Sequence, residues 1–326
     1  MSEWKDYFGS QTEWDAHTKR FDNNDFRQLY DWGEYLKSTG VNIERLAVIS
    51  NNKILLSAQY SLKKIWPFCI IYLPSGINGS SVEISSFIRS LKKKYKRYFI
   101  YIRIDIREQK NEKLVEQIVR LNFKKTIYSI RSREHMLVNL NNDTKKIIND
   151  AKHKWRYNYR KAIKKEIFIH FLKTIDPDQI FGLCKELSEF KNIRYMYSLK
   201  ELQMFKKYLN KYAHTTVAFN KEKQLVGCYI CIKYNSKAYQ IFNAVNKSGN
   251  ELMAGYSILI SVIDELKKIG LDQLDMGEIN QKRYPGNYQF KKSFNQNNVG
   301  LEGEYEWASN LILRYLINAY MFIVKA

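Results

Sequence analysis

The chain has 326 residues, a mass of 38.9 kDa and a formal net charge of +21, from 54 Lys and Arg against 33 Asp and Glu. Apolar residues make up 45% of it and charged residues 27%, which is typical of a folded globular protein and excludes a disordered chain, a collagen and a coiled coil. This length predicts two domains. The charge indicates an anionic partner, which is RNA, an anionic membrane face or a phosphate-bearing substrate.

Four cysteines are too few for a disulfide scaffold in a chain of this size. Cys228 and Cys231 form a CxxC pair, but in a predicted strand their side chains point to opposite faces. The five histidines are scattered, so we expect no metal site. The start, MSEWKDYFGS, has no apolar signal segment, which predicts a cytoplasmic protein.

The first 140 residues alternate helical and strand patterns. Asp25 is a candidate cap for a helix that places Leu29, Trp32 and Leu36 on one face. Strands are then predicted at 44–50, 54–60 and 68–73, a helix at about 80–96, a strand at 98–104, a helix at 111–121, and strands near 124–130 and 135–140.

The second half repeats this order. The patterns predict helices near 142–149, 152–165, 177–191 and 198–210, strands at 214–219, 224–234 and 237–245, a helix at 253–269 and a strand at 271–276. Gly270 is a plausible C′ glycine for the helix before it. Because helix, antiparallel strands, helix and strand occur twice in this order, we expect a duplicated domain of mixed α/β type.

The last twenty residues are apolar except for a stripe of Asn310, Arg314 and Asn318, which are four apart and share one narrow helical face. At about 1.5 Å per residue, the apolar run 311–324 is too short to span roughly 30 Å of hydrocarbon. Two interpretations stay open, a helix docked on the protein and a helix lying in a membrane interface.

Three segments together resemble the Fem family, the peptidoglycan-bridge aminoacyltransferases and their envelope-modifying relatives. They are FRQLYDWGEYLKSTG through IIYLPSGI, KHKWRYNYRKAIKKEIFIHF, and GYSILISVIDELKKIGLDQLDMGEINQKRYPGNYQFKKSF. The first is similar to the family's helix with Gln and Trp before two strands and a Tyr-x-Pro-x-Gly turn. The second is similar to its Lys/Arg-rich helix, and the third to its Asp-x-Gly strand end and Phe-Lys-x-x-Phe ending.

The resemblance covers most of residues 20–300 and implies an α/β fold of two tandem acetyltransferase-like (GNAT) domains, with mixed sheets flanked by helices. We place these domains at 1–140 and 141–306, followed by a C-terminal amphipathic helix at 307–326.

The family transfers an activated amino acid, usually from aminoacyl-tRNA, to an amine on a cell-wall precursor. The resemblance therefore implies an amide-forming aminoacyltransferase that binds no cofactor and uses aminoacyl-tRNA as its donor substrate. Its expected partners are a lipid-linked or nucleotide-linked envelope precursor and an anionic membrane surface at the inner face of the cell membrane.

Two residues match catalytic positions of the family. Attack of an amine on an ester creates an oxyanion, which needs a positive donor, and Lys291 matches the family lysine assigned to this task. Asp105, at a strand end in RIDIRE, matches an Asp that could orient the amine or accept its proton. The alternatives are a surface lysine and, for Asp105, a helix cap or a salt bridge to Arg103 or Arg107.

Further matches concern substrate binding. Arg194, in NIRYMYS, matches an arginine that contacts substrate phosphate, and its alternative is a structural ion pair. Tyr256, in AGYSIL, matches a tyrosine of the same cavity, and its alternative is core packing. Tyr288 and Phe290, beside Lys291 in the motif, are assigned to the same site.

The segment 145–165 holds nine Lys or Arg and one acid, Asp150. Arg156 and Arg160 are four apart on one helical face, so they are candidates for phosphate contact, and a solvated basic face is the alternative.

The sequence departs from the family near Trp32, where the substrate lysine position is occupied by Glu34 or Tyr35, and Lys37 is the nearest base. The acceptor therefore stays open between a muropeptide and a sugar amine on a lipid-linked or nucleotide-linked precursor.

Two other functional classes are alternatives. An acyl-CoA-dependent N-acyltransferase acting on an amino sugar of an envelope polysaccharide needs a glycine-containing loop for the pyrophosphate, and 250–258 has one glycine and lacks the pattern. An RNA-binding module without chemistry is the third class, and the sequence has no RNP1 motif.

Overall fold

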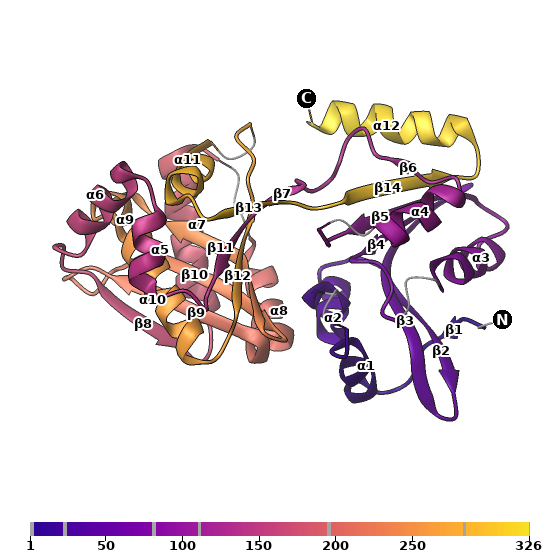
Figure 1. Ribbon diagram of the computed structural model, residues 1–326, viewed down its shortest axis with the longest axis horizontal. Helices are drawn as coiled ribbons and strands as arrows, with labels where there is room; N and C mark the ends of the chain where they lie inside the picture. The colour runs from indigo at the N-terminus through magenta and orange to yellow at the C-terminus, as the bar shows by residue number, and fades with distance from the viewer. Residues whose placement is uncertain are drawn as a thin grey trace. The chain divides into compact units, whose positions relative to one another are not determined.

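The structure is a computed structural model that describes residues 3–21, 25–79, 83–109, 112–193, 197–282 and 285–325. The chain forms two compact units (Figure 1). Unit 1 comprises Met1–Arg133 and Gly300–Ala326, and unit 2 comprises Glu134–Val299. Within the described residues, each unit is built on one seven-stranded mixed sheet.

The sheet of unit 1 joins sequence-distant strands. Its order is β1 (Lys5–Asp6), β2 (Ile43–Ser50), β3 (Lys53–Ile65), β4 (Phe68–Pro74), β5 (Phe99–Ile106), β14 (Gly303–Ala308) and β6 (Lys124–Lys125). Its helices are α1 (Gln11–Thr18), η1 (Phe26–Gln28), α2 (Tyr30–Ser38), α3 (Ile84–Lys94), α4 (Glu112–Arg120) and α12 (Leu311–Lys325). Strands β2 to β4 are antiparallel, and β4 and β5 are parallel across the α3 crossover.

The two faces of this sheet differ in chemistry. On one face, even-numbered residues of β5 such as Ile102 join an apolar core with Phe87 of α3. On the other face lie Tyr101, Arg103 and Asp105 of β5, together with their cross-strand neighbours on β14. Helices α1 and α2 pack at the β2–β3 end of the sheet, and α12 packs on β5 and β14.

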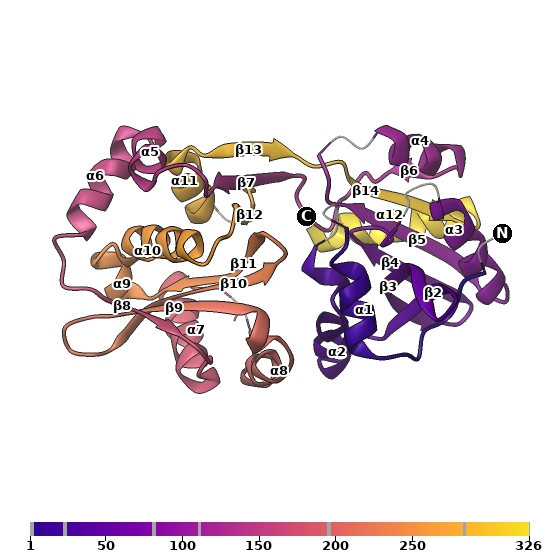
Figure 2. The ribbon, with the colours of Figure 1, turned by 60° about the horizontal axis from the view of Figure 1, so that its bottom comes forward.

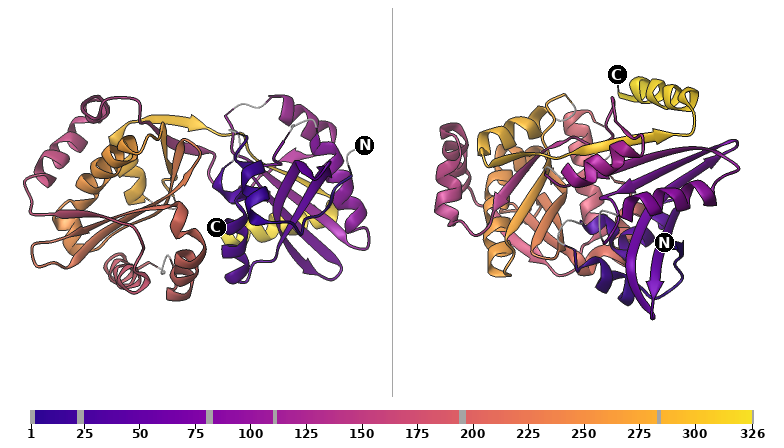
Figure 3. Two further views of the ribbon diagram at one scale, coloured as in Figure 1. Left: turned by 90° about the horizontal axis from the view of Figure 1, so that it is seen from below. Right: turned by 45° about the vertical axis from the view of Figure 1, so that its right-hand side comes forward.

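The sheet of unit 2 has the order β13 (Asn297–Gly300), β7 (Glu134–Asn139), β12 (Gln273–Glu278), β11 (Lys237–Val245), β10 (Leu225–Tyr234), β9 (Ala213–Phe219) and β8 (Phe168–Leu172). Its helices are α5 (Thr144–Asp150), α6 (His153–Ala162), α7 (Pro177–Lys191), α8 (Leu199–Leu209), η3 (Asn210–Tyr212), α9 (Lys247–Glu251), α10 (Ala254–Lys268) and α11 (Pro285–Phe294). Helix α10 lies on one face of the sheet with α5 and α6 beside it, and α7 and α8 lie on the other face (Figures 2 and 3).

The parallel strands β11 and β12 separate early. Their pairing is confined to Lys237–Tyr239 against Gln273–Asp275. On its other side, β12 has a register shift between Asp275 and Glu278 in its pairing with β7. The backbone around Met276 therefore lies outside both ladders, and the space between the carboxyl ends of the two strands is open to side chains from other elements.

The predicted order of elements is confirmed in both units, as β2–β3–β4, α3, β5 and as β9–β10–β11, α10, β12. The expected mixed α/β fold of two similar domains is thus present. A helix is also present near the end of the chain, and no helix among the described residues is long and apolar enough to cross a membrane.

The structure corrects the expected domain limits of 1–140, 141–306 and 307–326. Segment 134–139 is β7 of unit 2, and segment 303–308 is β14, which pairs with β5 in unit 1. The last helix begins at Leu311. The run GEYEWA alternates with the period of a strand, but its two glutamates face buried arginine and tyrosine side chains, so it lacks the apolar pattern by which a strand is predicted.

Candidate functional site

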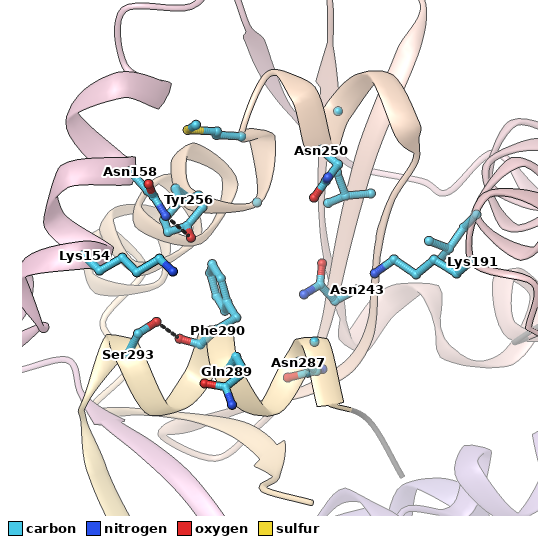
Figure 4. Close-up of a pocket in the computed structure, with 16 residues that line it drawn as sticks. Lys154, Asn158, Lys191, Asn243, Asn250, Tyr256, Asn287, Gln289, Phe290 and Ser293 are labelled. Carbon is cyan, nitrogen blue, oxygen red and sulfur yellow. Dashed lines mark hydrogen bonds between the residues drawn. The ribbon is translucent and has the colours of Figure 1, made fainter. Parts of the chain in front are cut away.

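Unit 2 contains a cavity of about 440 Å³ at the amino-terminal end of α10 (Figure 4). Its walls come from α6, α7, β11, α9, α10 and α11. Lys154 and Lys191 extend from opposite walls, with Asn243 and Phe290 between them. Among the described residues that line the cavity there is no Asp or Glu.

Aromatic side chains form one wall of this cavity. The ring of Tyr256 lies 5.1 Å from that of Phe290 and 5.2 Å from that of the buried Trp155. The Asn158 amide donates a hydrogen bond of 2.8 Å to the Tyr256 hydroxyl, which fixes this hydroxyl at the cavity. The structure thus brings the predicted Tyr256 and Phe290 together. The predicted Tyr288 packs on the same core, with the Lys292 ammonium 5.3 Å from its ring centre, and does not line the cavity.

The electrostatics of this cavity favour an anion. The amino end of the fifteen-residue helix α10 carries a partial positive charge, and Lys154 and Lys191 add two ammonium groups. Because no carboxylate lines the cavity, these charges are available to a phosphate group. The aromatic wall adds a surface on which a flat apolar or heterocyclic group can stack.

Lys291 lies on α11 and is only 3% exposed. Its ammonium donates hydrogen bonds to the carbonyl oxygens of Met276, at 2.5 Å, and Glu278, at 2.9 Å. These carbonyls belong to the irregular part of β12 described above. Burial lowers the pKa of Lys291 to about 8, against the raising effects of Asp275 and Glu278. The surface-lysine alternative is therefore wrong, although Lys291 does not line the 440 Å³ cavity.

Asp105 is buried at the end of β5 in unit 1. Its Oδ2 accepts hydrogen bonds from the Tyr72 hydroxyl at 3.0 Å and from Arg107 Nε at 2.8 Å. The salt-bridge alternative is thus present with Arg107. Arg103 instead pairs with two glutamates of β14, Glu304 at 3.0 Å and Glu306 at 3.5 Å.

A second cavity, of about 240 Å³, lies within unit 1 beside this group. Tyr72, Trp32, Arg27 and Arg131 line it, and Asp105 does not. The Tyr72 hydroxyl is therefore the atom through which Asp105 can act on a molecule in this cavity. Burial and the fields of Arg27 and Arg107 lower the pKa of Arg131 to about 10. Such a concentration of guanidinium groups suits an anionic group of a ligand.

The other predicted residues lie elsewhere. Arg156 is half-buried and donates to the backbone oxygen of Asn149 at 2.7 Å, and Arg160 is exposed. Neither lines the cavity of unit 2. Lys37 forms an ion pair of 2.9 Å with Glu34 and does not line the cavity of unit 1. Arg194 lies outside the described residues.

Several residues that line the two cavities were not predicted as site residues, among them Lys154, Asn158, Lys191, Arg27, Tyr72 and Arg131. Lys154 and Asn158 are four apart on α6, a spacing that the sequence offered but that many basic residues around it obscured. Tyr72 lies near the carboxyl end of β4, opposite Arg103 of β5, and carboxyl ends of parallel strands are where ligands bind. Lys191 and Arg131 had no local signal. No group of three or more His, Cys, Asp or Glu with metal-binding proximity occurs among the described residues.

Comparison with curated proteins finds distant relatives. No family model matches the sequence. The Lipid II:glycine glycyltransferase of Staphylococcus epidermidis is 25% identical over 206 residues, which are 55% of this chain and 49% of that protein. The protein of the same name from Staphylococcus aureus is 26% identical over 208 residues, with 56% and 49% covered. The chain spans about half the length of the curated relatives it matches.

Solved structures match the fold over nearly the whole chain. The crystal structure of FemX has a TM-score of 0.81 at 16% identity and covers 96% of this chain and 100% of its own. The C-terminal domain of a putative lysylphosphatidylglycerol synthetase from Agrobacterium fabrum has a TM-score of 0.61 at 9% identity, with 95% and 97% covered. A tandem GNAT protein from the clavulanic acid biosynthesis pathway has a TM-score of 0.58 at 11% identity, with 94% and 98% covered. These matches show that the two units form a tandem GNAT fold.

Proposed function

We propose that this chain, a GNAT-fold member of the Fem family, is an acyltransferase that joins an activated amino acid to an amine on a cell-envelope precursor. The name of the staphylococcal relatives describes the transfer of glycine to lipid II, which supports this reaction class. The observation that carries the proposal is the cavity of unit 2, which offers two lysines, a helix amino terminus and an aromatic wall to an anionic donor.

The proposed donor is aminoacyl-tRNA. Phosphates near the 3′ end would contact Lys154 and Lys191, and the terminal base or the amino-acid side chain would lie on Phe290 and Tyr256. The exposed Arg160 and the half-buried Arg156 on α6 would contact the RNA backbone outside the cavity. No bound cofactor is needed, because the ester of the charged tRNA already supplies an activated carbonyl group.

The proposed acceptor is an amine on a lipid-linked envelope precursor, bound by unit 1. Its amine would face the Tyr72 hydroxyl, so that Asp105 orients the amine or takes its proton through this hydroxyl. Arg27 and Arg131 would hold an anionic group of the same molecule. A charged-tRNA donor places this reaction in the cytoplasm, and a lipid-linked acceptor places it at the inner face of the membrane.

The chemical step is the attack of the amine on the ester carbonyl. A carbon–nitrogen bond forms, the ester carbon–oxygen bond breaks, and the tRNA leaves with its 3′-terminal hydroxyl after accepting a proton. We assign the Lys291 ammonium to the stabilisation of the oxyanion, a task that suits a compact, desolvated cation. Below pH 8 this lysine keeps its positive charge even though it is buried.

The second candidate is an acyl-CoA-dependent N-acyltransferase acting on an amino sugar of an envelope polysaccharide. The amino terminus of α10 in the unit 2 cavity favours it, because the pyrophosphate of CoA needs the same kind of helix end. The two candidates differ in the donor, so a donor assay separates them.

The assay incubates the purified protein with a pool of envelope precursors and either charged tRNAs or acetyl-CoA, and then measures product mass. A gain of one amino-acid residue that RNase abolishes is the expected result and also identifies the amino acid. A gain of one acetyl group from acetyl-CoA alone would replace the first proposal by the second. No mass gain with either donor, while an active Fem-type transferase modifies the same pool, would contradict both.

A further inference from the structure

Helix α12 is attached to unit 1 by its polar side. Glu306 of the buried polar sheet face accepts hydrogen bonds from Arg314 Nε at 2.8 Å and from the Asn318 amide at 3.0 Å. The Tyr101 hydroxyl also donates to Glu306, at 2.6 Å. Burial alone would raise the pKa of Glu306, but hydrogen bonds from Tyr101, Asn318 and Arg314 lower it further than burial raises it, so Glu306 stays a charged anchor.

The apolar side of α12 consequently points away from the protein. Seven large side chains of this helix are more than half exposed, namely Leu311, Ile312, Tyr315, Leu316, Tyr320, Phe322 and Ile323. A helix on the surface of a water-soluble monomer normally has the reverse orientation, with apolar residues inward and polar residues outward. Figures 1 and 3 show α12 lying along β14 on the outside of unit 1.

The exposed apolar surface continues onto the segment before β7. The ring of Phe322 lies 5.8 Å from that of Tyr128, and the nearby Ile127 and Ile130 are exposed. Ile130 also lines the 240 Å³ cavity of unit 1, together with Arg131. The apolar surface of α12 and the proposed acceptor cavity thus lie on connected parts of one unit.

We propose that α12 lies in the interface of an anionic membrane, with Ile312, Leu316 and Ile323 among the acyl chains. The apolar face with aromatic residues has the composition of interfacial helices. Lys124 of β6 is exposed and is the cross-strand neighbour of Glu306 of β14. Cross-strand neighbours project to the same face of a sheet, so Lys124 lies on the α12 side, where it can contact lipid headgroups. The net charge of +21 adds a long-range attraction to anionic lipids.

The same charge disfavours a second copy of the chain as the occupant of this face, because two molecules of +21 repel each other. The inference deepens the proposed function, in that a lipid-linked acceptor would be met at the membrane. The experiment below measures binding without donor or acceptor, so it can fail while amino-acid transfer is confirmed, and it can succeed while transfer is refuted.

The test is co-sedimentation of the full chain with vesicles of phosphatidylcholine alone or mixed with phosphatidylglycerol. The variant Ile312→Gln/Ile323→Gln makes the outward face polar with a residue that favours helices. The matched control is Ile49→Gln/Leu55→Gln, which changes two side chains of similar size, each about half exposed, on the β2–β3 hairpin of the same unit. Circular dichroism monitors the fold, and Leu316→Gln replaces the double variant should that variant unfold.

We expect the wild type and the control to bind the anionic vesicles, and the α12 variant to bind them at least about tenfold more weakly. Equal binding by the α12 variant and the control would overturn the proposal. Sedimentation equilibrium without lipid completes the test. A wild-type dimer that the α12 substitutions dissociate, without vesicle binding, would also overturn it and would make a second copy the occupant.

Discussion

The two units share one order of elements but differ in the partners of their buried charged side chains. In unit 1, the buried Arg103 lies between Glu304 and Glu306, and Asp105 pairs with Arg107. In unit 2, the buried Lys291 donates to two backbone carbonyls and has no ion pair within 4.0 Å among the described residues. Despite burial, polar neighbours in unit 1 lower the pKa of Glu306 and raise that of Arg103, so these two groups keep their charges, although burial raises the pKa of Glu304. In unit 2, burial lowers the pKa of Lys291 to about 8 and brings it close to losing its charge. A duplicated fold can thus provide a fixed polar scaffold in one copy and a titratable cation in the other.

The strongest test of the scaffold in unit 1 is Arg103→Met. This change removes Arg103 from the buried Glu304 and leaves Glu306 with Arg314, and breaking a buried pair costs about 3–5 kcal/mol. Urea unfolding should show this loss in the free energy of unfolding. Arg120→Met, which removes an exposed ion pair with Glu116, is the control and should change little. A loss for Arg103→Met as small as that of the control would mean that the charges of unit 1 are not coupled.

The corresponding test in unit 2 is Lys291→Ala. Removal of a donor to an oxyanion should lower turnover by about 10²-fold or more. The neighbouring Lys292 is exposed, so Lys292→Ala should keep near-normal turnover. Product formation is measured under saturating donor and acceptor, with thermal unfolding alongside. Near-normal turnover of Lys291→Ala would mean that Lys291 has only a structural task, the hydrogen bonds to the carbonyl oxygens of Met276 and Glu278.

A pH series examines the same lysine without mutation. Because the folded pKa of Lys291 is about 8, its positive charge disappears as pH rises through 8, and turnover should fall there. Stability should move the other way. Between the folded pKa of about 8 and the ordinary lysine pKa of 10.5, the unfolded chain binds more protons than the folded chain, so this group's contribution to the free energy of unfolding rises with pH. In Lys291→Arg the fall in turnover above pH 8 should be absent; an unchanged profile would assign the titration to another group.

Tyr72→Phe tests whether unit 1 takes part in chemistry. It removes the hydroxyl that joins Asp105 to the cavity and keeps the ring. We expect kcat/KM for the acceptor to fall about tenfold, with the KM for the donor unchanged. Tyr98→Phe, in the same unit and packed against the apolar core, is the control. Equal kinetics for the two variants would remove Asp105 and Tyr72 from the mechanism.

The smallest expected effect separates two pairs of basic residues on unit 2. Lys154→Ala/Lys191→Ala should weaken donor binding several-fold. The slope of the logarithm of the binding constant against the logarithm of the salt concentration should become shallower by up to about one for each lysine removed. Arg156→Ala/Arg160→Ala should have a smaller effect, because these residues lie outside the cavity. Equilibrium binding at several salt concentrations measures both. The reverse ranking would move the phosphate site from the cavity to the exposed side of α6.

The sequence alone predicted the strands and helices whose apolar residues recur with a regular period. Runs of apolar residues located β2, β3 and β4. The helical period located α10, which Gly270 follows. Resemblance to the Fem family then pointed to Tyr256 and Phe290, which the structure brings together. These features depend on residues close in sequence or on a motif with fixed spacing, so they needed no knowledge of the tertiary fold.

The features that were missed depend on contacts between distant segments. Glu304 and Glu306 made β14 resemble an exposed segment, because their partners Arg103 and Tyr101 lie some 200 residues earlier, at separations of 201 and 205. The polar stripe of α12 was recognised, but a helical pattern does not indicate which face meets the protein. On α6, basic residues occur on all sides, so spacing could not distinguish Lys154 from Arg156.

The central claim, that the cavity of unit 2 holds the charged end of an aminoacyl-tRNA, can be tested by photo-crosslinking. The probe is a tRNA with an amide-linked, photoreactive amino acid at its 3′ end, and the readout is peptide mapping by mass spectrometry. We expect crosslinks in peptides that contain Tyr256 or Phe290, suppressed by excess unmodified charged tRNA and weakened in Lys154→Ala/Lys191→Ala. Crosslinks confined to unit 1, or unaffected by that competitor, would contradict the assignment.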